Sequence, residues 1–142
     1  VQAVGIDVGS QRLTLFNTHL ESMFPANRLA QIDVMGRVVG TDCEGVCVVL
    51  GDLNAAPVGG AFDEGAMEKV HAVLATYRDA FAGQADGPGT WTFPANRPAR
   101  RLDHVLYGPG LLPLHADVYH ASGAVSDHLP LVVVLQASEG GR

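Results

Sequence analysis

Side chains that can bind a metal ion or move a proton occur in four short stretches, each next to an apolar segment of the chain. The stretches are Asn17-Thr18-His19-Leu20, Gly51-Asp52-Leu53-Asn54, Arg101-Leu102-Asp103-His104 and Ser126-Asp127-His128-Leu129-Pro130. In layered sheets the ends of strands are where loops assemble sites on a rigid scaffold. We therefore expect side chains from all four stretches to converge on a single pocket.

Asp52 and Asn54 follow directly after the apolar run Val46–Leu50. Two residues apart in an extended chain, their side chains face the same way. A carboxylate beside an amide oxygen can hold a hard cation and orient a water molecule. The alternative is an Asx-turn, in which both side chains cap the loop backbone. The tetrapeptide alone leaves both interpretations open.

His128 stands beside an acid, and such a histidine can act as a general base or stabilise charge near neutral pH. Asp103 is a candidate partner, because a carboxylate that accepts a hydrogen bond from an imidazole fixes its tautomer. Alternatively, Ser126 and Asp127 cap a turn, and Asp103 pairs with a neighbouring arginine. His19 ends another strand, where a histidine serves as a catalyst or as a solvated capping residue.

The elements that must position these residues are predicted from the apolar pattern. Alternation predicts strands over 1–8 and 12–18, joined as a hairpin, and helical spacing predicts helices over 25–39 and 60–75. The continuous apolar run over 46–50 predicts a buried central strand. Further strands are expected over 90–93, 102–107, 114–119 and 131–135. This order of elements indicates a layered α/β or α+β fold.

Composition narrows the class of protein. The chain has 142 residues, 47% of them hydrophobic and 17% charged, which excludes a mainly disordered state. No apolar run approaches the roughly 20 residues of a transmembrane helix. Two cysteines exclude a disulfide scaffold, and we expect Cys43 and Cys47 to be ordinary thiols. The net charge of −6 argues against unspecific electrostatic binding to nucleic acid, although a bound divalent cation could offset it.

In this order, the four stretches resemble the endonuclease/exonuclease/phosphatase superfamily, which includes deoxyribonuclease I, exonuclease III, neutral sphingomyelinases and inositol-polyphosphate 5-phosphatases. The resemblance runs from about Val1 to Leu135, and Thr90-Trp91-Thr92-Phe93 is similar to the threonine/aromatic segment of the family. It implies a four-layered α/β (α+β) sandwich of two mixed β-sheets flanked by helices. It also implies metal-dependent hydrolysis of a phosphate ester by a phosphodiesterase, nuclease or phosphatase, with Mg²⁺ or alternatively Mn²⁺.

The resemblance also implies roles for individual residues. Asp52, Asn54 and Asp127 would be metal ligands, with Asp52 also positioning the attacking water and Asn54 supporting the phosphate, metal or nucleophile. The catalytic set would be His19, Asp52, Asn54, Asp103 and His128. Within it, His128 would act as base or transition-state stabiliser oriented by Asp103, and His19 would hydrogen-bond a phosphoryl oxygen.

One departure from the family pattern concerns the start of the domain. Family members carry an early strand with an asparagine and, further on, the glutamate that is the principal metal ligand, both ahead of the histidine-bearing strand. Only eighteen residues precede His19 here, and Glu21 follows it. We therefore expect residues 1–142 to be the C-terminal part of a single domain whose N-terminal part is absent. Such a part would expose apolar sheet surface and show weak metal affinity and little turnover alone.

The substrate is left open among a small phosphodiester, a lipid headgroup and a nucleic acid. The rival hypothesis is a non-catalytic, truncated or decayed homologue that acts as a binding module through its unpaired sheet. A serine hydrolase is disfavoured because no Gly-x-Ser-x-Gly occurs. A zinc site formed by His104, His115 and His120 is disfavoured because they lie on separate strands. The arginines at 97, 100 and 101 contact substrate phosphate or line a solvated loop.

Overall fold

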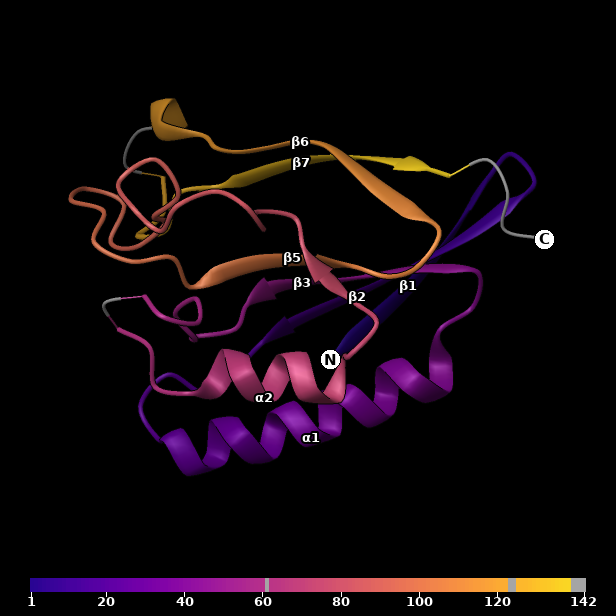
Figure 1. Cartoon of the computed structure of the whole chain (residues 1–142), viewed down its shortest axis with the longest axis horizontal. Coiled ribbons are helices and arrows are strands. Elements are labelled where there is room, and N and C mark those ends of the chain that lie inside the picture. The colour runs from indigo at the N-terminus through magenta and orange to yellow at the C-terminus, as the bar shows by residue number, and fades with distance from the viewer. Residues whose placement is uncertain (61, 123–124, 139–142) are drawn as a thin grey trace.

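The computed structural model describes residues 1–60, 62–122 and 125–138, and its elements form layers (Figure 1). One sheet contains β1 (Gln2–Val8), β2 (Gln11–His19), β3 (Val46–Asp52), β5 (Asp103–Tyr107) and β4 (Arg78–Asp79), in the order β1-β2-β3-β5-β4. The second sheet pairs β6 (Leu111–Val118) with β7 (Leu131–Ala137), and a 3₁₀ turn (His120–Ser122) follows β6. Helices α1 (Pro25–Asp42) and α2 (Ala66–Val73) cover the outer face of the first sheet. The predicted layered α+β fold with two sheets and flanking helices is confirmed.

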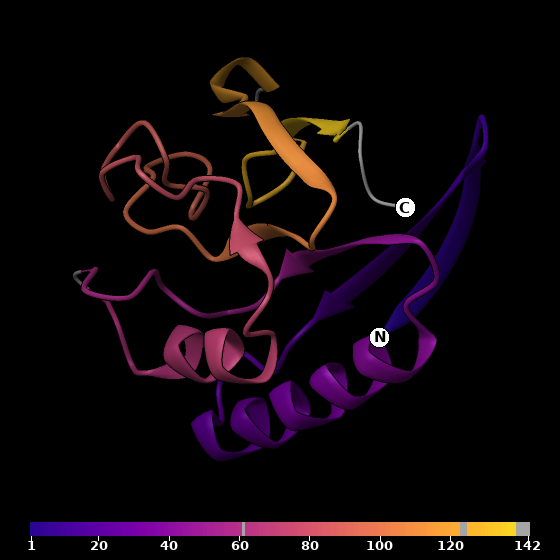
Figure 2. The ribbon, with the colours of Figure 1, turned by 45° about the vertical axis from the view of Figure 1, so that its right-hand side comes forward.

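The predicted buried strand lies in the middle of the five-stranded sheet. β1 and β2 form the predicted antiparallel hairpin, β2 and β3 run parallel with α1 as their connection, and β5 runs antiparallel to β3. The hairpin projects beyond the part of the sheet that the helices cover (Figure 2). Parallel β2 and β3 therefore end at the same edge, where antiparallel β5 begins.

The main core lies between the helices and this sheet. Ile32, Met35 and Val39 of α1 are buried at helical spacing against Phe16 and Val49 of the sheet. Pro25 occupies the first turn, where its missing N–H removes no helical hydrogen bond. A second cluster, built on Phe81, Val118 and Leu129, joins the two sheets. None of the described helices is long and apolar enough to span a membrane.

The second helix is shorter than the predicted range 60–75. Asp63 accepts hydrogen bonds from the backbone N–H groups of Gly59 and Gly65, at 2.7 and 2.8 Å. Gly65 then has a φ of 75°, a left-handed conformation that glycine adopts without a Cβ clash. These contacts hold a turn ahead of Ala66, so the helix begins only there.

Two further expectations are corrected. The predicted strand over 90–93 is absent and reduces to a single bridge between Phe93 and Arg100, because backbone bonds from Thr90 and Trp91 to Gly87 hold a tight loop instead. Cys43 and Cys47 are not free thiols but form a disulfide. The turn between α1 and β3, with Gly45 at a φ of 74°, brings their Cα atoms to 6.0 Å.

Apolar side chains are exposed on several strands. They belong to β1, β6 and β7 and include Val4, Ile6, Val8, Leu112, Leu114, Val132 and Val134. An apolar cavity of about 530 Å³ also separates Leu15 and Leu50 of the first sheet from Val133 of the second. The expected exposed sheet surface is thus present, whereas the assignment of residues 1–142 to the C-terminal part of a larger domain stays a prediction.

Candidate active site

Strand register brings three of the predicted site residues into one row. His19 is the last residue of β2 and is the register partner of Asp52, the last residue of β3. Asp52 is in turn the partner of Asp103, the first residue of β5. Register partners on adjacent strands present their side chains on the same face of a sheet. The edge where these strands meet therefore places one imidazole and two carboxylates side by side.

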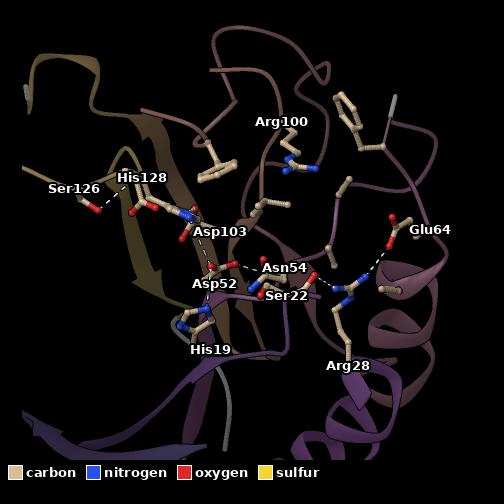
Figure 3. A pocket seen from close by; sticks show the side chains of 17 residues that line it. His19, Ser22, Arg28, Asp52, Asn54, Glu64, Arg100, Asp103, Ser126 and His128 are labelled. Atoms are coloured by element: carbon tan, nitrogen blue, oxygen red, sulfur yellow. Dashed lines mark hydrogen bonds and ion pairs between the residues drawn. The ribbon is translucent and has the colours of Figure 1, made fainter. Parts of the chain in front are cut away.

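Asp52 lies at the centre of this row (Figure 3). Its Oδ1 accepts a hydrogen bond from the backbone N–H of Asn54 at 2.8 Å, and its Oδ2 lies 3.3 Å from Nε2 of His19 and 3.7 Å from Nε2 of His128. Burial raises the pKa of the Asp52 carboxyl above its ordinary value, and the negative charge of Asp103 raises it further. The backbone hydrogen bond and the two imidazoles oppose this rise.

His128 is held by contacts of its ring and of the backbone around it. Its Nδ1 donates to Oδ2 of Asp103 at 2.7 Å, because an ionised carboxylate can only accept. The ring of Phe93 lies 4.8 Å away between centroids. The backbone N–H of His128 donates to Oγ of Ser126, and that of Leu129 donates to the carbonyl of Thr92. These contacts direct Nε2 of His128 towards Asp52.

Asn54 joins the two loops that follow β2 and β3. Its Nδ2 donates to the carbonyl oxygen of Leu20 at 2.8 Å, and its backbone has a φ of 47°. Asparagine is among the few residues that tolerate this left-handed conformation. The Asx-turn weighed for Asp52 and Asn54 is present, yet it uses only Oδ1 of Asp52. The second oxygen of Asp52 stays directed at the histidines, so the turn and a functional role coexist.

A buried ionic network of Asp79, Arg101 and His104 lies next to this edge of the sheet. Arg101 donates to both carboxylate oxygens of Asp79, at 3.1 and 2.9 Å. Nδ1 of His104 lies 3.3 Å from Asp79, and its Nε2 lies 2.8 Å from the carbonyl oxygen of Ala55. Burial raises the pKa of the Asp79 carboxyl, but His104 and Arg101 outweigh it and hold that pKa well below its usual range. Asp103 pairs with His128, which is the partner expected for it, and the alternative ion pair of Asp103 with a neighbouring arginine does not occur among the described residues.

Both ring nitrogens of His104 face acceptor oxygens, one on a carbonyl and the other on a carboxylate. The ring of His104 is fully buried. His104 thus ties the loop after β3 to the Asp79 network through Ala55.

All the predicted site residues line one cavity of about 580 Å³. They are His19, Asp52, Asn54, Asp103, Asp127 and His128. Cavities of this size hold small-molecule ligands. The structure thus gathers the four polar stretches into the single pocket that was expected, although the roles of the individual residues stay predictions.

Asp52, Asp103 and His128 are the described residues whose ligand atoms could surround a metal ion, with all three atoms within 4.8 Å of one another. Carboxylates suit Mg²⁺ and Mn²⁺, whereas imidazole suits zinc, iron, nickel and copper ions. Asp52 belongs to the predicted metal set, whereas Asp127 is exposed and is not in this group. The three residues fit a divalent cation that keeps some of its water ligands.

The cavity also holds side chains that the sequence did not single out. The guanidinium of Arg28 is buried and donates to the carbonyls of Glu21 and Ser22 and, at 2.6 Å, to Glu64. Arg28 stands four residues before Ile32 on the apolar stripe of α1, and a charged residue in such a stripe was a usable signal. His115 and His120 are exposed, and neither joins His104 in a cluster of metal ligands among the described residues.

Three solved structures of similar fold illustrate the likeness. An endonuclease/exonuclease/phosphatase from Beutenbergia cavernae DSM 12333 has a TM-score of 0.71 and 21% identity, over 95% of this chain and 38% of that one. D. rerio TDP2 complexed with single strand DNA product has a TM-score of 0.73 and 19% identity, over 95% of this chain and 60% of that one. Bacteroides thetaiotaomicron VPI-5482 mannosyl-6-phosphatase has a TM-score of 0.66 and 17% identity, over 90% of this chain and 52% of that one. At these identities the likeness shows the fold.

The chain therefore spans between 38% and 60% of the length of these three structures. No curated protein shows a significant match to the chain. A family model described as Endonuclease/Exonuclease/phosphatase family matches residues 4–128, which include three of the four polar stretches in full and the fourth as far as His128. Since this match covers most of the chain, the chain belongs to the endonuclease/exonuclease/phosphatase family.

Proposed function

We propose that this chain carries catalytic residues for the metal-dependent hydrolysis of a phosphate ester. The observation that carries the proposal is the convergence of His19, Asp52, Asp103 and His128 at one sheet edge, around Oδ2 of Asp52. The family name joins endonucleases, exonucleases and phosphatases, which all hydrolyse phosphate esters. A cavity with two carboxylates and two imidazoles suits that chemistry, because it combines cation ligands with proton donors.

Each residue has a task in this proposal, and Asp103 has two, because it also orients His128. Asp52 and Asp103 would hold a divalent cation, Mg²⁺ or Mn²⁺, with Asn54 beside them, and the bound cation would polarise the phosphoryl group. His128 is oriented by the hydrogen bond of its Nδ1 to Asp103. Its Nε2 is the atom that transfers a proton among the attacking water, the phosphate and the leaving oxygen. His19 is exposed and donates from Nε2 to a phosphoryl oxygen, which stabilises the charge that develops there.

A small phosphate ester is the substrate class that the site favours. The cavity of about 580 Å³ matches a small ligand rather than an extended polymer groove. The net charge of −6 opposes binding that depends on neutralising many phosphates. One similar structure is a TDP2 with a single strand DNA product, and another is a mannosyl-6-phosphatase. Proteins of this fold therefore include one that binds a nucleic acid and one named for a sugar phosphate.

The placement of residues 1–142 in the C-terminal part of a larger domain stands beside this function as a proposal. It is supported by the share of the similar structures that the chain covers, 38 to 60%. The exposed apolar side chains of β1, β6 and β7 support it as well. Further metal ligands would then come from another part of the domain, and the chain alone would bind metal weakly.

Hydrolysis of bis(p-nitrophenyl) phosphate tests the function, in this chain and in any longer form of the protein. We expect turnover that requires Mg²⁺ or Mn²⁺, stops with a chelator, and is lost in Asp52→Ala and His128→Ala. The exposed residues Asp42 and His71 provide matched control substitutions, Asp42→Ala and His71→Ala, which keep full activity. Turnover that survives both site substitutions would refute the proposal, and inactivity of every form would favour the binding-module hypothesis.

A further inference from the structure

Arg100 is a half-buried cation on the wall of the proposed active site, and its environment differs from that of the buried arginines Arg28 and Arg101. We propose that Arg100 determines substrate specificity by binding a second phosphate group, next to the phosphate that is hydrolysed. The inference rests on the proposed function and deepens it, because it names the substrate class as a small phosphate ester that carries an additional phosphate.

The guanidinium of Arg100 lies against two aromatic rings. Its central carbon lies 5.4 Å from the ring centroid of Phe62 and 5.3 Å from that of Phe93. The backbone is fixed as well, because Arg100 and Phe93 exchange hydrogen bonds of 3.1 and 3.0 Å across their bridge. Figure 3 shows the guanidinium pointing into the cavity. The group is thus positioned before any ligand arrives, which lowers the entropic cost of binding.

The charge of Arg100 is also uncompensated. Arg28 pairs with Glu64 at 2.6 Å, and Arg101 pairs with Asp79 at 2.9 Å. Arg100 forms no ion pair within the described part of the chain, although the same cavity is lined by several carboxylates. Among the arginines of this cavity, Arg100 is therefore the one whose charge is left for a ligand.

The chemistry of the arrangement points to an oxyanion. Cation–π contacts do not use the N–H groups of a guanidinium as hydrogen-bond donors, so its edge N–H groups stay available. These edge groups can bind two oxygens of a phosphate at once, and such bidentate charged hydrogen bonds are the strong ones. In a pocket lined by several carboxylates, the side chain of Arg100 provides an attractive point for a dianionic phosphate.

Position separates this group from the phosphate that reacts. The proposed reaction centre lies around Asp52, between His19 and His128. Phe62 belongs to the loop between β3 and α2, and Figure 3 shows Arg100 on the side of the cavity that faces Glu64, across from His19. The cavity of about 580 Å³ is larger than one phosphate requires. We therefore assign the reacting phosphate to the histidine side and the second phosphate to Arg100.

The test compares ligands that differ by one phosphate, thymidine 5′-phosphate and thymidine 3′,5′-bisphosphate. Calorimetry with a chelator present measures their binding to the wild type, to Arg100→Gln and to Arg100→Lys. We expect the wild type to bind the bisphosphate about tenfold more tightly. Arg100→Gln abolishes that preference, and Arg100→Lys, which keeps the charge but not the planar fork, keeps part of it.

Arg97 offers the matched control, because Arg97→Gln removes the same charge from the same loop at an exposed position outside the cavity. Arg97→Gln is expected to keep the full preference for the bisphosphate. Equal loss of preference in Arg97→Gln and Arg100→Gln would overturn the inference, since general electrostatics would then explain it. Unchanged thermal unfolding midpoints show that the variants are folded.

A kinetic arm separates this inference from the proposed hydrolysis. The p-nitrophenyl ester of thymidine 5′-phosphate is assayed with Mg²⁺, with and without a 3′-phosphate. We expect Arg100→Gln to raise KM about tenfold for the 3′-phosphorylated ester alone, with kcat unchanged. Equal effects on both esters, or no bisphosphate preference in the wild type, overturn the inference. A bisphosphate preference that depends on Arg100 but comes without turnover, in this chain and in any longer form of the protein, refutes the hydrolysis and leaves the phosphate subsite standing.

Discussion

Nδ1 of His128 donates a 2.7 Å hydrogen bond to Oδ2 of Asp103, and this contact joins the loop before β7 to the first residue of β5. The bond links two stretches that are 25 residues apart in the chain. It fixes which nitrogen of the ring carries the shared proton, so that Nε2 is the nitrogen that faces Asp52 and the cavity. The orientation of the proposed proton-transfer group thus depends on a carboxylate that need not touch the substrate.

Removing the charge of Asp103 is expected to impair turnover more than folding. In Asp103→Asn an amide replaces the carboxylate, and its NH₂ group competes for Nδ1 and favours the wrong tautomer of His128. We expect kcat for a phosphodiester to fall about 100-fold or more. Rate measurements check this, with Asp42→Asn at the exposed end of α1 as control. A fall of only a few fold would show that Asp103 does not orient His128.

Metal binding provides a second prediction, and it is independent of turnover. Asp52 and Asp103 offer the carboxylates of the metal group, so Asp52→Asn removes a charged oxygen ligand. We expect Mn²⁺ to broaden NMR signals of His128 and its neighbours in the wild type, because the ion is paramagnetic. About tenfold more Mn²⁺ should be needed in Asp52→Asn. Broadening that starts elsewhere, or that is equal in both proteins, would contradict a metal site at this edge.

The sequence predicted the site better than it predicted what supports the site. His19, Asp52 and Asp103 each stand at the end of an apolar segment, so their meeting depended only on the order and direction of three strands. The apolar run over 46–50 marked the central strand by composition alone. Signals of this kind can be recognised in a single sequence because each of them lies within one strand or its immediate flank.

Features that need two distant segments were not predictable. The pair of Asp79 and Arg101 exists because the two-residue strand β4 joins β5, and two residues show no periodicity. The disulfide of Cys43 depends on the exact end of α1 and on a left-handed turn at Gly45. The spacing of the two cysteines alone is equally compatible with free thiols.

Two substitutions of Asn54 separate the effect of backbone strain on the free energy of unfolding from the effect of a lost hydrogen bond. Asn54→Ala loses the contact to the carbonyl of Leu20 and places a Cβ at a φ of 47° without a polar side chain to compensate. Asn54→Gly loses the same contact but relieves the strain. We expect the glycine variant to have a free energy of unfolding about 1 kcal/mol higher than the alanine variant. Urea unfolding of the two variants checks this, and a more stable alanine variant would show that the left-handed backbone is not strained.

The last prediction concerns the buried pair of Asp79 and Arg101, its contribution to the free energy of unfolding and the dependence of that contribution on pH. The exposed pair of Asp7 and Arg12, with an N–O distance of 2.9 Å like that of the buried pair, is its matched control. Asp79→Asn leaves the buried guanidinium of Arg101 without its counter-charge, and we expect the free energy of unfolding at pH 7 to fall by about 3 kcal/mol. Asp7→Asn should cost less than about 1 kcal/mol, because solvent screens the exposed pair.

The pH dependence of this difference follows from the lowered pKa of Asp79. A carboxyl whose pKa is lower in the folded protein contributes stability that is fully present above its ordinary pKa of 3.8. That contribution is lost as the pH falls below this value towards the folded pKa, since protonated Asp79 no longer balances Arg101. Urea unfolding of the wild type and Asp79→Asn should therefore give a constant difference from pH 7 down to about 4 and a shrinking one below it. A difference that grows on acidification would mean that Asp79 is protonated in the folded protein.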